Sequence, residues 1–215
     1  MILTEQEELA VVIVFASRAE ANIFLAAVSG KLLQSGPYEM FVFDLSNSDL
    51  RGLCLISGIG KIAAEVALRY TFIQCKPHYV INAGLAGSLL DDSLLGELVQ
   101  VDTVMDFNVD DLYQEEESFT TQQGPWNDLM SLSLLSVDRP VMDKELRMKL
   151  SRRAHIVDME GYEIAHVCAT FGVPCLILKA ISDYANANTK KSFREKLPAL
   201  SQSLANILVE HLDRF

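Results

Sequence analysis

A nearly continuous apolar run near the end of the chain places the strongest limit on its fold. The run covers residues 174–181 and is followed directly by Ser182 and Asp183. Apolar residues at successive positions suit a strand buried on both faces, as in a parallel sheet that helices cover on each side. Polar groups at the carboxyl end of such a strand face the crevice in which α/β proteins bind ligands. The run therefore predicts a core strand that leads into a binding site.

Strands and helices are predicted to alternate along the sequence, because apolar runs are interleaved with segments of helical periodicity. This alternation predicts an α/β sheet sandwiched between helices, and a chain of 215 residues needs no second core, so we expect a single domain over residues 1–215. The predicted strands are 11–16, 40–45, 53–57, 79–83, 98–105, 155–157 and 175–182. The predicted helices are 20–33, 61–74, 143–152, 161–171 and 192–212, the last capped by Ser192.

One polar stretch, residues 106–128, interrupts this alternation. It contains the pair Asp110-Asp111, three successive glutamates at 115–117 and the turn-forming pair Gly124-Pro125. Clustered charges next to glycine and proline are typical of a solvated loop. We expect the whole stretch to be such a loop.

Charge and composition exclude several classes of function. The net charge of -11 and the scatter of only 18 basic residues argue against binding to nucleic acid or to an anionic membrane. The four cysteines stand singly in apolar runs, which indicates reduced thiols of a cytoplasmic protein and no metal site. The first eight residues are acidic, and no apolar run reaches about 18 residues, so neither a leader nor a membrane span is predicted. A small-molecule substrate is the expected partner.

Two carboxylates lie at the ends of adjacent core elements in the last third of the chain. Glu160 immediately precedes the predicted helix 161–171, and Asp183 ends the predicted strand. Each has an ordinary structural explanation, since an acid at a helix start is favoured by the helix dipole and aspartate is a common cap. Their joint occurrence at one end of an α/β sheet favours a functional site instead.

Two glycine-rich segments, residues 57–61 and 83–87, are each predicted to turn from a strand into a helix. Such turns can direct backbone N–H groups at an anion or a ribose, although tight turns need glycine for backbone geometry alone. Neither segment matches GxGxxG or GxxxxGK[ST]. A dinucleotide or nucleoside triphosphate is therefore not implied.

Four blocks, in order along the chain, resemble the purine and uridine phosphorylase superfamily, and within it the 5'-methylthioadenosine/S-adenosylhomocysteine nucleosidases. The blocks are SGIGKIAA at 57–64, INAGLAGSL at 81–89 followed by GELV at 96–99, DMEGYEIAHVC at 158–168, and AISD at 180–183. The resemblance implies a three-layer αβα sandwich with a central mixed sheet. It also implies a homodimeric enzyme that cleaves a nucleoside without a cofactor.

The resemblance assigns roles to the residues at matching positions. Glu20 stands where these nucleosidases have the glutamate that activates the attacking water, Glu160 would hold the ribose hydroxyls, and Asp183 would protonate the leaving purine. Taken alone, Glu20 is equally well explained as an exposed acid in the first turn of a helix. The other residues expected to bind substrate are Gly84, Leu85, Ala86, Val141, Met159 and Ser182.

Three positions depart from the family pattern. Leu85 stands where phosphorylases commonly hold phosphate with a hydroxyl group, which favours water as the nucleophile. Pro140 replaces the aromatic residue that stacks on the purine, and Lys179 replaces an arginine. The expected reaction is hydrolysis of the N-glycosidic bond of a 5'-substituted adenosine-like nucleoside. A futalosine-type hydrolase, a phosphate-dependent phosphorylase and a nucleoside-binding relative without turnover are the alternatives.

Overall fold

The computed structural model describes residues 7–46, 49–90, 94–110, 117–187 and 189–215. The strands of these residues form one mixed sheet in the order β10-β6-β8-β9-β5-β1-β4-β3-β2, with β7 paired to β6 and β10 also paired to β5. Strand bounds are β1 Glu7–Phe15, β2 Lys31–Gln34, β3 Glu39–Asp44, β4 Arg51–Ile56, β5 Cys75–Ser88, β6 Leu98–Phe107, β7 Ser118–Thr120, β8 Met130–Val137, β9 Ile156–Asp158 and β10 Cys175–Asp183.

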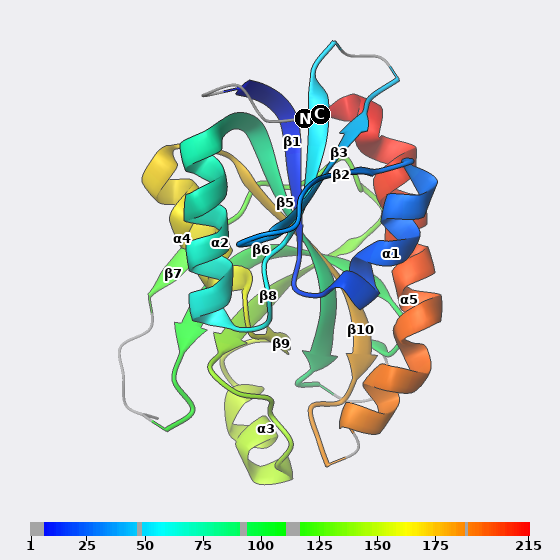
Figure 1. Ribbon diagram of the computed structural model, residues 1–215. Coiled ribbons are helices and arrows are strands. Elements are labelled where there is room, and N and C mark those ends of the chain that lie inside the picture. Colours follow the sequence, from blue (N-terminus) through cyan, green and yellow to red (C-terminus); the bar gives the residue numbers. More distant parts are fainter. Residues whose placement is uncertain (1–6, 47–48, 91–93, 111–116, 188) are drawn as a thin grey trace.

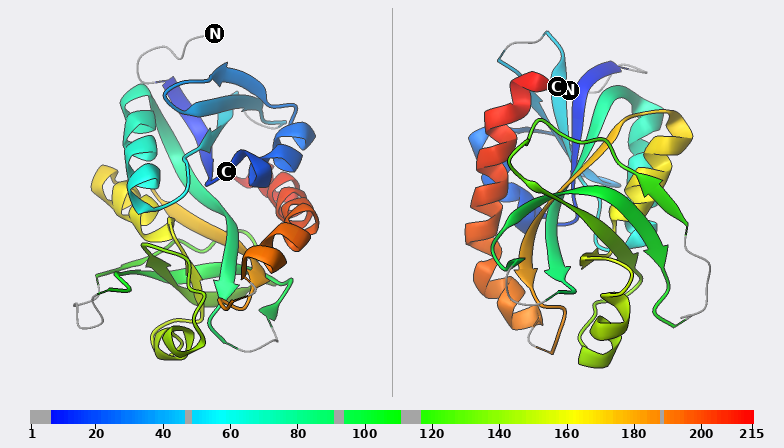
Figure 2. Two further views of the ribbon diagram at one scale, coloured as in Figure 1. Left: turned by 60° about the horizontal axis from the view of Figure 1, so that its bottom comes forward. Right: turned by 180° about the vertical axis from the view of Figure 1, so that it is seen from behind.

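Helices cover the sheet on both sides, as Figures 1 and 2 show. Helix α1 packs with α5 on one side and α2 with α4 on the other, and each pair covers its own cluster of buried apolar side chains. The helices are α1 Arg18–Ala27, α2 Lys61–Gln74, α3 Lys144–Leu150, α4 Gly161–Phe171 and α5 Thr189–His211, which continues into the 3-10 turn η2 Leu212–Arg214. The predicted three-layer αβα sandwich with a mixed sheet is confirmed.

Three parallel strands at the centre of the sheet, β1, β5 and β10, set the position of the site. β5 pairs in parallel with β1 on one side and with β10 on the other, so their carboxyl ends lie at one edge. Every residue of β10 is buried, as the apolar run predicts. The polar residues that follow these strands therefore meet at that edge.

The predicted helix 20–33 is too long. Helix α1 ends at Ala27, Ser29 has a φ of 51°, and residues 31–34 form β2, which pairs antiparallel with β3. A side chain at Gly30 would meet Leu25 Cδ2 at 2.7 Å. The pairing with β3 therefore overrides the helical periodicity of residues 31–33. The local sequence pattern carries no information about this long-range pairing.

The predicted turn at residues 83–87 is wrong. These residues continue β5 and pair with β10, and neither Gly84 nor Gly87 has a positive φ. Gly84 is required for a different reason, because a Cβ atom there would lie 3.1 Å from Glu20 Oε1. The other predicted turn is confirmed, since Gly58 and Gly60 have φ values of 88° and 98° just before α2 begins.

The stretch 106–128 is more ordered than predicted. Residues 106–107 belong to β6, residues 118–120 form β7, and Trp126 is buried. Residues 111–116, including Asp111 and two of the three glutamates, lie outside the described residues, as do residues 1–6 of the acidic start. Strand β8 is an element that the sequence analysis does not predict, although its alternation of serine and leucine fits a half-buried strand.

Helix α5 begins at Thr189 rather than at Ser192. The Ser192 hydroxyl donates a hydrogen bond to the backbone oxygen of Ser182 at 2.8 Å, so it does not cap the helix. This bond ties the helix start to the end of β10. In the described part of the chain, no helix has the length and apolar character needed to cross a membrane.

Candidate active site

A cavity of about 390 Å³ lies at the carboxyl ends of β1, β5 and β10, within the size range of small-molecule sites. Apolar residues make up most of its wall, and four of its eight polar side chains are carboxylates. The lining residues are Ala16, Ser17, Glu20, Ile59, Leu85, Ala86, Gly87, Val137, Pro140, Val141, Val157, Asp158, Met159, Glu160, Ser182, Asp183, Ala185, Thr189, Phe193 and Arg194.

The cavity brings together all but one of the residues that the sequence predicts for the site. The expected catalytic residues Glu20 and Asp183 both line it, and so do Leu85, Ala86, Val141, Met159, Glu160 and Ser182. Gly84 does not line it but lies behind the Glu20 carboxylate. Segments more than 160 residues apart in the sequence thus contribute to one site.

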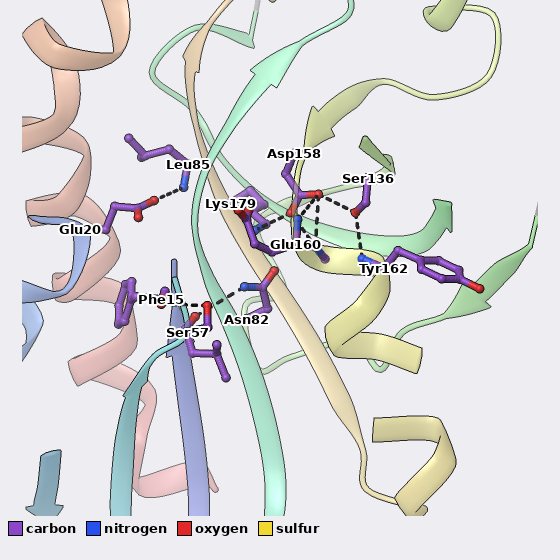
Figure 3. Close-up of polar contacts among 12 residues, drawn as sticks. Phe15, Glu20, Ser57, Asn82, Leu85, Ser136, Asp158, Glu160, Tyr162 and Lys179 are labelled. Carbon is purple, nitrogen blue, oxygen red and sulfur yellow. Dashed lines mark hydrogen bonds and ion pairs between the residues drawn. The ribbon is translucent and has the colours of Figure 1, made fainter. Parts of the chain in front are cut away.

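Glu20 lies in the first turn of α1, yet it is buried rather than exposed. The Ser17 hydroxyl caps this helix and donates to Glu20 Oε2 at 2.7 Å. The Leu85 backbone N–H donates to Glu20 Oε1 at 3.1 Å, as Figure 3 shows. The side chain is only 5% accessible to solvent. The alternative of an exposed acid that merely favours the helix dipole is therefore wrong.

Glu160 precedes α4 but makes no side-chain hydrogen bond to its own helix. Its Oε1 instead accepts a hydrogen bond from the Gly60 N–H at 2.7 Å, a contact between residues 100 positions apart. No described residue donates to Glu160 Oε2, which leaves that oxygen for a ligand. The alternative of a simple helix cap does not account for this orientation.

The pKa of Glu160 is raised to about 7, mainly because burial penalises the charged form. The nearby Asp158 carboxylate raises it further, Lys179 and the Gly60 N–H lower it, and Glu20 adds a small increase. Glu160 therefore changes charge near neutral pH. Such a shifted carboxyl group in a cavity is typical of functional sites.

Asp183 is held by three donors at the point where β10 ends. Its Oδ1 accepts hydrogen bonds from the Ala185 N–H and the Thr189 hydroxyl, each at 2.8 Å, and its Oδ2 lies 2.6 Å from the Ser182 hydroxyl. The Ser182 hydroxyl also lies 3.3 Å from the backbone oxygen of Ala86, which is a second acceptor within its reach. The carboxyl group is thereby fixed in orientation, and it also organises the turn into α5.

A buried ion pair lies next to these carboxylates, and one of its members, Asp158, also lines the cavity. Lys179 Nζ is 2.8 Å from Asp158 Oδ2, with side-chain exposures of 2% and 1%, and Asp158 also accepts from the Ser136 hydroxyl at 2.5 Å (Figure 3). A Cβ atom on Gly84 would lie 3.8 Å from Lys179 Nζ and 3.1 Å from Glu20 Oε1. The ammonium group thus lies close to the acids of the cavity floor.

Sequence reasoning identified Lys179 only as a departure from a family pattern and did not find its partner. A lysine inside an apolar strand is itself a signal, because a buried ammonium group needs a buried acid. Ser17, Ile59, Thr189, Phe193 and Arg194 were also missed. Nothing in their local spacing indicates a site, since contacts between distant segments bring them to the cavity. The described residues contain no group of three or more metal-ligating side chains.

Comparisons with known proteins agree with this geometry. The sequence model of the phosphorylase superfamily matches residues 11–147 and 132–213. A 5'-methylthioadenosine/S-adenosylhomocysteine nucleosidase of Haemophilus ducreyi is 30% identical, over 75% of this chain and 79% of that protein.

Two solved structures share the fold across almost the whole chain. A Helicobacter pylori nucleosidase mutant with 5'-methylthioadenosine in its active site is 24% identical and superposes with a TM-score of 0.83, covering 96% of this chain and 99% of the other. A mutant of Helicobacter pylori futalosine hydrolase is 22% identical, with a TM-score of 0.82 over 97% and 100%.

Proposed function

Because the chain belongs to the phosphorylase superfamily, we propose that it is a nucleosidase that hydrolyses the N-glycosidic bond of a 5'-substituted adenosine-like nucleoside without a cofactor. The similarity to a nucleosidase of Haemophilus ducreyi supports this choice of reaction. The observation that carries the proposal is that Glu20, Glu160 and Asp183 are buried and line one cavity.

Each of the three acids has a distinct task in the proposed reaction. Protonated Asp183 hands its proton to the purine while the bond between the base and C1' breaks, so the base leaves as a neutral molecule. Glu160 accepts hydrogen bonds from the ribose hydroxyls and lies where positive charge develops on the sugar. Glu20 takes a proton from water as the water oxygen bonds to C1'. The products are free base and a free ribose derivative.

The hydrogen bonds around Glu20 support water rather than phosphate as the nucleophile. The Leu85 N–H, a donor that an anion would need, already binds the Glu20 carboxylate. The buried ammonium group of Lys179 is paired with Asp158. A phosphate dianion beside Glu20 would be repelled by the carboxylates and would find no free donor in the described part of the floor. A neutral water molecule would not be repelled.

A base-release assay over a panel of nucleosides tests this function. The panel contains 5'-methylthioadenosine, S-adenosylhomocysteine, adenosine and futalosine, each with and without phosphate. We expect base release that does not depend on phosphate, and a free sugar product by mass spectrometry. A ribose 1-phosphate product would make the protein a phosphorylase, and saturable nucleoside binding without base release would make it a binding protein.

We also propose that the protein is a homodimer that forms through α2. Ile62 and Ile73 are 78% and 73% exposed, and with Val66 they form an apolar stripe on one face of this helix, which begins two residues after the exposed Ile59. Ile59 also lines the cavity, so a second copy on this stripe would border the site.

Light scattering at known protein concentration tests the dimer. The double change Ile62→Asp and Ile73→Asp should yield monomers, whereas Met148→Asp, at an apolar position on α3 that is 56% exposed, should leave the mass unchanged. A parent protein that is monomeric at micromolar concentration would contradict the proposal.

Two further expectations stay proposals. One sheet through all described strands supports a single domain over residues 1–215. Four free, buried cysteines support a cytoplasmic location.

A further inference from the structure

Ser17 lines the cavity beside Glu20 and has no task in the reaction proposed above. It is half-buried at the start of α1, and its hydroxyl contacts two groups of Glu20. The hydroxyl accepts from the Glu20 backbone N–H at 3.4 Å and donates to Glu20 Oε2 at 2.7 Å. One hydroxyl thus joins the backbone and the carboxylate of the same residue, which fixes the Glu20 side chain relative to its own helix.

This arrangement differs from the usual one at such a helix start. A serine at the N-cap with a glutamate three residues later commonly forms a capping box, in which the glutamate side chain turns back to the backbone N–H of the serine. In the described structure the Glu20 carboxylate instead accepts from the Ser17 hydroxyl and from the Leu85 N–H. The carboxylate therefore lines the cavity rather than stabilising the end of its own helix.

The Glu20 carboxylate is held by one donor on each oxygen. The Leu85 N–H binds Oε1 at 3.1 Å, and the Ser17 hydroxyl binds Oε2. The backbone of β5 lies against the same group, since a Cβ atom at Gly84 would be 3.1 Å from Oε1. A carboxylate has about four acceptor sites, of which these two donors use two. The remaining sites are available to accept a hydrogen bond from water in the cavity.

Building on the proposed function, we infer that Ser17 is the positioning residue of the base: its hydroxyl holds the Glu20 carboxylate in the orientation that takes the proton of the attacking water. In that step the water oxygen bonds to C1', one O–H bond of the water breaks, and the proton passes to Glu20. The electron pair of the bond between C1' and the base leaves with the base, which Asp183 protonates. Ser17 neither gains nor loses a proton. It acts on the alignment that proton transfer requires.

The alternative is that Ser17 only caps α1, because the same hydroxyl does both. Three substitutions separate the two roles, since threonine and glycine are tolerated at an N-cap and alanine is not. Ser17→Thr keeps the hydroxyl and the cap. Ser17→Gly removes the hydroxyl with little loss of helix stability, and Ser17→Ala removes the hydroxyl and the cap together without adding backbone freedom.

We expect kcat to follow the hydroxyl donor and the melting temperature to follow the cap. On the best nucleoside of the panel, Ser17→Gly and Ser17→Ala should each lower kcat by roughly 10–100-fold and leave KM within about twofold, whereas Ser17→Thr should keep kcat within about threefold. The melting temperature should fall mainly in Ser17→Ala. Asp143→Ala removes the corresponding cap of α3, outside the cavity, and should lower the melting temperature while keeping kcat.

A double variant tests whether Ser17 acts through Glu20. Glu20→Gln cannot take a proton from water, so kcat should fall by roughly 10²–10⁴-fold. Adding Ser17→Ala to Glu20→Gln should then lower kcat by less than about twofold, because the group that Ser17 orients no longer acts as a base. An equal loss in both backgrounds would mean that Ser17 acts elsewhere, which contradicts the inference.

The outcomes separate this inference from the proposed function. If the parent hydrolyses a nucleoside and Ser17→Ala keeps the parent kcat, the function stands and Ser17 only caps the helix. A rise in KM at unchanged kcat would make Ser17 a substrate contact, and a kcat that follows the melting temperature would make its effect structural. A loss in Ser17→Thr equal to that in Ser17→Ala would also overturn the inference, since threonine keeps the donor. A parent that hydrolyses no nucleoside contradicts the proposed function, and with it the step assigned to Glu20 and Ser17.

Discussion

The floor and the mouth of the cavity differ in their burial and in their hydrogen bonding. At the floor, Glu20, Glu160 and Asp183 are buried and each is fixed by hydrogen bonds, above the buried pair of Asp158 and Lys179. At the mouth, Ile59 and Arg194 are exposed and have no polar contact with the described protein residues. The proposed reaction assigns its chemical steps to the buried, hydrogen-bonded groups of the floor.

The largest effect is expected at the floor, at the group assigned as acid. Asp183→Asn should lower kcat by roughly 10²–10⁴-fold, because the amide cannot donate a proton to the purine. The asparagine oxygen can still accept from Ala185 and Thr189, so the melting temperature should stay near that of the parent. Asp143→Asn removes a carboxylate at the start of α3, outside the cavity, and serves as the control in the same assay. Base release by the Asp183 variant at the parent rate would show that another group is the acid.

The buried ion pair should respond to substitution as a unit. Lys179→Met leaves Asp158 charged and unpaired among buried groups, so the free energy of unfolding should fall by about 3–5 kcal/mol. Adding Asp158→Asn removes that unpaired charge and should restore much of the loss. Urea unfolding of the two single variants and the double variant measures this coupling. Additive losses would mean that the pair does not act as a unit in the floor.

Glu160 distinguishes a ligand-binding floor from a purely structural one. Glu160→Gln should lower kcat/KM on ribonucleosides. The loss of transition-state stabilisation should be about 1.5–3 kcal/mol, the value of a charge-assisted hydrogen bond. The parent should discriminate against 2'-deoxy substrates, and the variant should discriminate less. Glu145→Gln, an acid in the first turn of α3, is the control for a helix-dipole effect. A Glu160 variant that melts early but keeps its activity per folded molecule would make Glu160 structural.

A smaller effect concerns pH and stability without ligand. The folded pKa of Glu160, about 7, lies above its ordinary value of 4.5, so between these values the folded state holds more of its proton than the unfolded state does. This residue's contribution to stability is therefore present below about pH 4.5 and lost as the pH rises through about 7. The drop in melting temperature from about pH 5 to about pH 8 should be smaller in Glu160→Gln than in the parent. An equal drop in both proteins would contradict the raised pKa.

The parts of the fold that sequence predicts well are those specified by local pattern. The buried strand β10 is readable because most of its residues form one apolar run, interrupted only by Lys179, and Asp183 is found because it follows that run. The end of α1 and the continuation of β5 past Ala83 are not readable, since both depend on pairing with strands elsewhere in the chain.

The same distinction applies within the site. Glu20 and Glu160 are found from motifs, but their hydrogen bonds to Leu85 and Gly60 join segments 65 and 100 residues apart. Arg194 has no signal in its neighbours, because the bonds of Thr189 and Ser192 determine that it faces the cavity. Residue types therefore identify the chemistry of this site, and long-range contacts determine its shape.

The bond between Thr189 and Asp183 has a consequence for protein engineering. The same hydroxyl that anchors the first turn of α5 also orients the proposed acid. A redesign that shifts this helix to admit a bulkier substrate would move a donor away from Asp183, so a gain in substrate range would come with slower chemistry. Directed evolution of this site should proceed first through side-chain exchanges at Phe193 and Arg194, which leave the helix backbone in place.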